Sequence, residues 1–106
     1  MKKVSDKHLK QLEQYRLLRE KLYQLSDGRS ELSGKHPTYS HSLCGYVCES
    51  HHIDGRDGER LVNAFGIILV TSDEHAFIHA NPLIHSKEEL YKLVKPIRIK
   101  QGFEES

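Results

Sequence analysis

The chain has 106 residues, 37% of them hydrophobic, so one compact domain with a small core is expected over residues 1–106, and two domains are excluded. Its 16 Lys and Arg residues nearly balance 15 Asp and Glu residues, and the net charge of +1 does not by itself indicate a nucleic-acid-binding protein. Two cysteines cannot form a disulfide framework, and we find neither a signal peptide nor a membrane-spanning apolar run. These features predict a protein of the cytoplasm that does not enter membranes.

The first predicted element is a helix over residues 5–26, capped by Ser5 or Asp6. Arg16 and Arg19 lie off its apolar stripe, where they face water or a ligand. Residues 1–30 hold eight basic and four acidic side chains, so this helix carries either a nucleic-acid-binding face or a solvated one. The stripe consists of residues three or four apart: Leu12, Tyr15, Leu18, Leu22 and Leu25.

Two strands are predicted in the middle of the chain. Residues 27–42 are rich in Gly and Ser and indicate a connector, after which residues 45–53 favour a strand. The sequence Asp-Gly-Arg-Asp-Gly at 54–58 predicts a loop. Residues 66–70 are apolar and predict a buried strand, which can pair with the first strand as an antiparallel hairpin.

Two capped helices are predicted in the last third. Thr71 can cap a helix that has acidic residues in its first turn and stops before Pro82. Ser86 and Glu89 form an S-x-x-E box that starts a second helix over 86–95, with Leu90, Leu93 and Val94 as core residues. The tail from 97 onward shows no pattern. The fold class is therefore α+β: an N-terminal helix, a hairpin with a helix, and a C-terminal helix.

Histidine is the unusual residue, with eight in the chain and four between positions 51 and 79. His75 and His79 are four apart, so on a helix they share one face and can hold one divalent metal ion. A third ligand must come from elsewhere in the fold. Adjacent residues of a strand point to opposite sides, so only one of His51 and His52 can face that metal directly.

The stretch HHIDGRDGERLVNAFGIILVTSDEHAFIHANP, residues 51–82, resembles the ββα-metal finger of HNH endonucleases, especially the small HNH proteins of bacteriophages. In that family His-His-x-x-Gly-Arg closes the first strand and an H-x-x-x-H helix completes the motif. The resemblance implies that residues 44–82 form the ββα core. It also implies that His51, His75 and His79 bind the metal and that His52 is the general base.

The resemblance further implies the reaction and the way the substrate is bound. Arg56 would contact a phosphate next to the cleaved bond, and Arg16 and Arg19 would bind nucleic acid from the first helix. The expected reaction is hydrolysis of DNA with 5′-phosphate and 3′-hydroxyl products, assisted by one divalent ion. Mg²⁺ or Mn²⁺ suits this chemistry, and three imidazoles also suit Zn²⁺ or Ni²⁺.

Two features of the sequence depart from the family pattern. The family's middle asparagine is replaced by Gly66, and the nearest asparagine, Asn63, would have to fix the loop of the base histidine from a shifted register. Many relatives also have two CxxC pairs that bind a structural zinc. This chain has only Cys44 and Cys48, so we expect no four-cysteine zinc site and interpret both cysteines as small core residues.

Three functions stay open at this point. The first is a nicking endonuclease of low specificity, related to phage proteins and acting on DNA in a bacterial host cell. The second is a degenerate finger that binds nucleic acid without cleaving it, and the third is a site-specific homing or restriction nuclease. A homodimer, or a partner from phage recombination, is the open alternative to a protein that acts alone.

Overall fold

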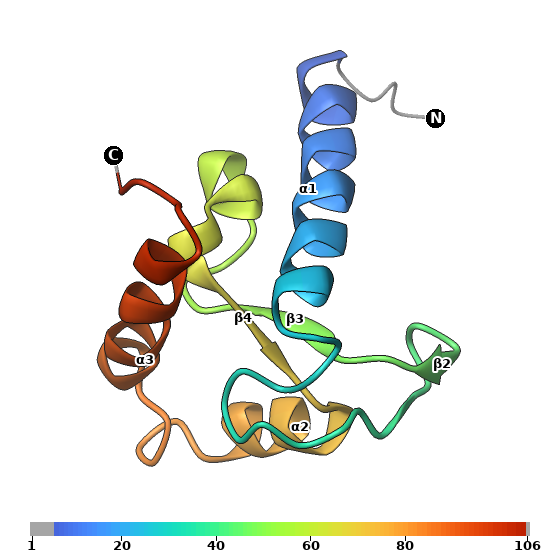
Figure 1. Cartoon of the computed structure of the whole chain (residues 1–106), viewed down its shortest axis with the longest axis vertical. Helices are drawn as coiled ribbons and strands as arrows, with labels where there is room; N and C mark the ends of the chain where they lie inside the picture. Colours follow the sequence, from blue (N-terminus) through green and yellow to red (C-terminus); the bar gives the residue numbers. More distant parts are fainter. Residues whose placement is uncertain (1–5, 106) are drawn as a thin grey trace.

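The computed structural model describes residues 6–105 and has the expected α+β class (Figure 1). Ser5, one of the two expected caps, lies outside these residues. The helices are α1 (Asp6–Leu25), α2 (Ser72–Ala80) and α3 (Lys87–Lys100), and the strands are β1 (Tyr39–Ser40), β2 (Gly45–Tyr46), β3 (Glu49–His52) and β4 (Ile67–Val70). Two short 3-10 helices, Gly58–Val62 and Ala64–Gly66, connect β3 to β4. No described helix is both long and apolar enough to span a membrane.

Strands β3 and β4 form the antiparallel pair predicted from the sequence, with His51 opposite Ile68 and His52 opposite Ile67. The strand predicted over 45–53 is wrong in its first half, because Gly45–Tyr46 pairs with β1 in a separate two-stranded sheet. Residue 48 carries the chain from one sheet to the other, and the Tyr23 hydroxyl donates to its carbonyl. That side-chain partner replaces the hydrogen bond that a continuous strand would supply.

Strand β4 is completely buried because both of its faces are covered. Ile68 and Val70 face one side and pack in a cluster with residues of α2 and α3. Ile67 and Leu69 face the other side and pack against Leu22 of α1. Because residues 67–70 are all apolar, β4 lies between α1 on one side and α2 and α3 on the other. Strand β3, which pairs with β4, lies beside α2.

Several predicted core residues are exposed. Of the α1 stripe, Leu22 is buried and Tyr15 and Leu18 pack against its cluster, but Leu12 and Leu25 are 40% and 44% exposed. Leu25 is the last residue of α1, and Leu12 belongs to the half of the helix that extends away from β3 and β4 (Figure 1).

The two later helices begin as predicted. Thr71 and Glu74 form a full capping box at the start of α2, and the Ser86 hydroxyl accepts from the Glu89 amide at the start of α3. In α2, Ile78 is buried, whereas Phe77 is 47% exposed and contacts the His85 ring, so Phe77 does not anchor the helix to the strands.

The predicted end of α3 near Pro96 is wrong, because the helix continues to Lys100. Proline lacks one amide donor, but Val94 before it and Arg98 after it are both fully buried on the inner face of α3. Tertiary packing thus outweighs the local cost of Pro96. Leu90 and Val94 are core residues as predicted, whereas Leu93 is 37% exposed.

Candidate metal centre

Three imidazoles converge where β3 meets α2. His51 comes from β3, and His75 and His79 lie one turn apart on α2. One ring nitrogen from each lies within 4.8 Å of the others, and the Nε2 atoms of His75 and His79 are 3.1 Å apart. This arrangement can hold one metal ion, as the histidine spacing predicts. Three imidazole nitrogen ligands fit a divalent transition metal and leave positions for oxygen atoms of water or substrate.

The fourth histidine, His52, points away from this triad. Its Nε2 atom lies 3.2 Å from the carbonyl oxygen of Leu61, and its ring centre lies 5.2 Å from that of Tyr15. Alternation along β3 accounts for the difference, since His51 and His52 are adjacent. A carbonyl can only accept a hydrogen bond, so in the neutral ring Nε2 carries the proton and Nδ1 can accept one.

Both strand histidines are held neutral. Burial, together with the neighbouring His75, His79 and His52, lowers the pKa of His51 to about 4. Burial also lowers the pKa of His52, although the bond to the Leu61 carbonyl partly opposes this. At neutral pH His51 therefore offers a free electron pair to a metal, and His52 can take a proton.

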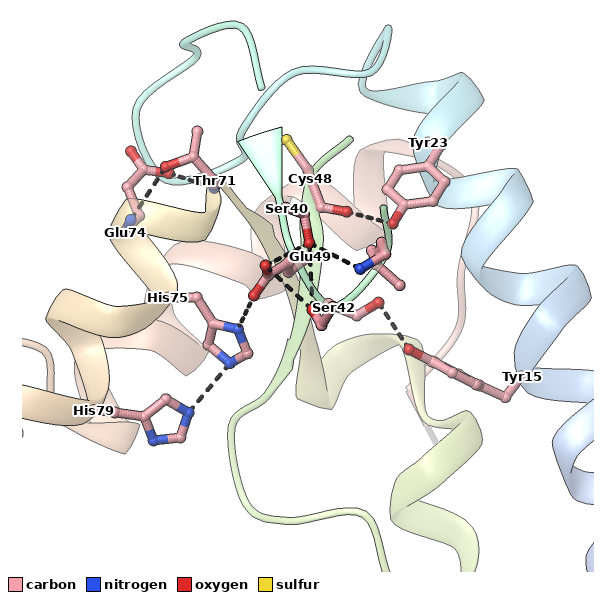
Figure 2. A network of polar contacts seen from close by, with 12 residues as sticks. Tyr15, Tyr23, Ser40, Ser42, Cys48, Glu49, Thr71, Glu74, His75 and His79 are labelled. Carbon is pink, nitrogen blue, oxygen red and sulfur yellow. Dashed lines mark hydrogen bonds and ion pairs between the residues drawn. The ribbon is translucent and has the colours of Figure 1, made fainter. Parts of the chain in front are cut away.

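Glu49 orients one of the triad histidines and was not identified from the sequence. Its Oε1 accepts from Nδ1 of His75 at 2.7 Å, and its Oε2 accepts from the Ser40 hydroxyl at 2.6 Å (Figure 2). Burial alone would raise the pKa of Glu49, but hydrogen bonds from Ser40, His75 and Ser72 outweigh it and hold the pKa below its ordinary value. With its Nδ1 proton donated to Glu49, the neutral ring of His75 has an unprotonated Nε2, which accepts from Nε2 of His79 and can bind a metal. The available signal was the position of Glu49 two residues before His51, on the same face of the strand.

We expect Glu49→Ala to weaken metal binding by about 10- to 100-fold, because His75 would lose the acceptor that fixes its ring. Titration calorimetry with Zn²⁺ or Ni²⁺ would measure the change. Glu13→Ala on the exposed face of α1 is the matched control, since Glu13 pairs only with Arg16 among the described residues. Equal affinities for wild type and Glu49→Ala would contradict the orienting role.

The structure separates the three arginines predicted to bind nucleic acid. Arg19 and Arg56 both lie over the ring of Tyr15 and line a pocket with His75. Arg16 instead pairs with Glu13 and Glu20 on the exposed surface of α1. The geometry therefore brings Arg19 and Arg56 to the site and leaves Arg16 in a local ion-pair network.

Asn63 lies in the loop between β3 and β4 and not beside the triad. Its Oδ1 accepts from the Phe65 amide and caps the second 3-10 helix. A side chain at Gly66 would first meet the Asn63 amide nitrogen, at 3.7 Å. Asn63 thus stabilises the turn at residues 64–66 that leads into β4, and its role in fixing the loop of His52 stays a prediction.

The two cysteines have different environments. Cys48 is buried, as predicted, and its thiol donates to the Gly28 carbonyl. Cys44 is exposed in the turn between β1 and β2, with a φ of 55°, so its assignment to the core was wrong. A tight turn at the surface, and not packing, determines its position.

Comparisons of the chain with protein-family models, with curated proteins and with solved structures gave no match.

Proposed function

We propose that this protein is a metal-dependent endonuclease of the HNH type, which hydrolyses phosphodiester bonds of DNA with low sequence specificity. The observation that carries the proposal is the convergence of His51, His75 and His79, with the neutral His52 next to His51 on β3 and its ring on the opposite side of the strand. A metal-ligand triad next to an imidazole base is the donor set that such hydrolysis requires.

Each residue has a separate task in the proposed reaction. His52 takes a proton from the attacking water on Nδ1, while the Leu61 carbonyl holds the opposite nitrogen. A divalent ion bound by the triad would polarise the phosphate and stabilise the charge on the leaving oxygen. Glu49 keeps His75 in the orientation that binds the ion. Water attacks phosphorus, the bond to O3′ breaks, the leaving oxygen takes a proton from solvent water, and the products carry a 5′-phosphate and a 3′-hydroxyl.

We also propose a biological setting for this activity. The substrate is DNA inside a bacterial host cell, and the protein is related to phage nucleases. It acts alone, as a homodimer, or with a recombination partner. The metal is Mg²⁺ or Mn²⁺, with Zn²⁺ and Ni²⁺ compatible with three imidazole ligands.

A second candidate is a degenerate finger that binds nucleic acid without cleaving it. Gly66, at the position of the family's asparagine, and the net charge of +1 favour this alternative. A site-specific homing or restriction nuclease is the third candidate. Discrete digestion products would favour that third function, and a smear would favour the first.

Cleavage of supercoiled plasmid and of single-stranded DNA, with Mg²⁺, Mn²⁺, Ni²⁺, Zn²⁺ or EDTA, tests the proposal. We expect nicked circles with at least one metal and none with EDTA. His79→Ala should abolish both metal binding and cleavage, because it removes one of three ligands. If folded, metal-loaded wild type cleaves neither substrate, the enzyme proposal is wrong and the binding alternative takes its place.

A further inference from the structure

A second feature of the site is a pocket of about 220 Å³ between α1, the β1–β2 turn and the loop after β3. It shares His75 and Glu49 with the metal centre, so a ligand in the pocket would lie directly beside that centre. The pocket has one wall from α1 and one from the turn, lined respectively by Tyr15 and Arg19 and by Ser42 and Leu43.

Tyr15 connects the pocket to the proposed base. The guanidinium carbons of Arg19 and Arg56 lie 5.6 Å and 5.3 Å from the centre of its ring. The ring also packs against His52, and its hydroxyl donates to Ser50 Oγ at 2.8 Å. One side chain of α1 thus supports two cations and the base histidine at once.

The charge of the pocket favours an anion. Neither Arg19 nor Arg56 has an ion pair within residues 6–105, and Nε of Arg19 is buried without a hydrogen-bond partner there. Asp54, an alternative partner for Arg56, is paired instead with Lys87 and Arg60. The carboxylate of Glu49 also lines the pocket, but His75 and Ser40 donate to its two oxygens. Two planar guanidinium groups with free donors match the geometry of a phosphate.

We propose that this pocket extends the phosphate contact expected of Arg56: Arg19 of α1 joins Arg56 as a donor to the backbone phosphate next to the scissile one, and Tyr15 is the positioning residue that holds both guanidinium groups. The inference rests on the proposed function for the location of the cleaved bond. It specifies the substrate class: a polynucleotide strand with consecutive phosphates, and not a small phosphodiester. It also assigns α1 a part in substrate binding through Arg19 and not through Arg16.

Binding can be tested without cleavage, by fluorescence anisotropy of a fluorescein-labelled 12-nucleotide DNA strand in EDTA. We expect Arg19→Gln and Arg56→Gln each to weaken binding by about tenfold, and to lower the slope of log affinity against log salt by about one. Arg16→Gln is the matched control: it removes the same charge from the same helix, but its guanidinium is already paired. Its affinity should stay within about twofold of wild type, since a paired exposed charge adds little. Equal losses in Arg16→Gln and Arg19→Gln would overturn the inference, because they would indicate a general charge effect.

Tyr15 variants test the positioning role. Tyr15→Phe keeps the ring and should bind the strand like wild type, whereas Tyr15→Leu removes the support for both guanidinium groups and should bind about as weakly as the arginine variants. Thermal unfolding of each variant controls for the fold. If Tyr15→Leu does not fold, the arginine variants decide alone. Wild-type affinity in a folded Tyr15→Leu variant would contradict the positioning role.

The outcome separates this inference from the proposed function. Metal-dependent cleavage together with unchanged binding by Arg19→Gln and Arg56→Gln would overturn the phosphate pocket and leave the nuclease proposal standing. Arginine-dependent binding by a wild-type protein that does not cleave would overturn the nuclease proposal. In that case the pocket would stand as a phosphate site of a binding protein.

Discussion

His52→Ala is expected to slow DNA cleavage by about 10²- to 10⁴-fold at neutral pH while metal binding is retained, because general-base catalysis contributes an effect of that size. His52 points away from the triad, so its removal takes no ligand from the metal. His51→Ala, on the same strand, should instead lose affinity for the metal. The two substitutions are thus expected to have different effects: His52→Ala lowers the cleavage rate, and His51→Ala lowers the affinity for the metal.

Single-turnover cleavage rates and metal titrations on the same preparations would measure the two effects. His85→Ala is the matched control, since His85 contacts Phe77 outside the site and its loss should leave the rate unchanged. A His52→Ala variant that is folded, metal-loaded and as fast as wild type would remove His52 from the mechanism. The Leu61 carbonyl would then be a structural contact only.

The metal triad could be predicted because it depends on local periodicity. The four-residue spacing of His75 and His79 fixes their common face once α2 forms, and Thr71 begins that helix with a capping box. Alternation along β3 predicts that only one of His51 and His52 faces the metal, whereas the choice of His51 came from the family resemblance and not from the pattern. These regularities belong to single elements or to one hairpin, so the sequence contains them.

The parts of the site that depend on contacts between distant segments were not predicted. The acceptor for His75 is Glu49, which is itself held by Ser40 from another sheet, and the acceptor for His52 is a backbone carbonyl that no residue type identifies. The sequence also did not show that Arg16 and Arg19 lie in different environments, because both residues lie off the apolar stripe of α1. Only the position of Tyr15 shows which arginine faces the site.

The same limit applies to the fold. Residues 97–106 show no periodic pattern, and yet Arg98 is fully buried at the centre of a network that joins three segments. Its guanidinium donates to both oxygens of Glu31 in the connector, to the carbonyl of Ala64 in the second 3-10 helix and to the carbonyl of Ile67 at the start of β4. A buried arginine resembles a surface residue in the sequence, since its partners are far away along the chain.

Arg98→Met is expected to lower the free energy of unfolding by about 3–5 kcal/mol, because it leaves the buried carboxylate of Glu31 without its partner. The loss is large compared with the ~5–15 kcal/mol that stabilises a typical domain. Urea unfolding followed by circular dichroism would measure it. The exposed Arg16→Met variant is the control and should unfold close to wild type, and an equal midpoint for Arg98→Met would contradict the role of the network.

A double variant tests whether Arg98→Met loses stability because the buried carboxylate of Glu31 is left unpaired. Glu31→Leu combined with Arg98→Met should be less destabilised than the sum of the single variants, since neither ion is then left unpaired. The double variant should still be less stable than wild type, because two sets of hydrogen bonds are lost. Glu31 accepts from the Leu69 amide, and Arg98 donates to the carbonyls of Ala64 and Ile67. The bonds to Leu69 and Ile67 hold β4, the strand opposite His51 and His52. At temperatures where Arg98→Met is still folded, its metal affinity should therefore fall together with its stability, although Arg98 contacts none of the four site histidines.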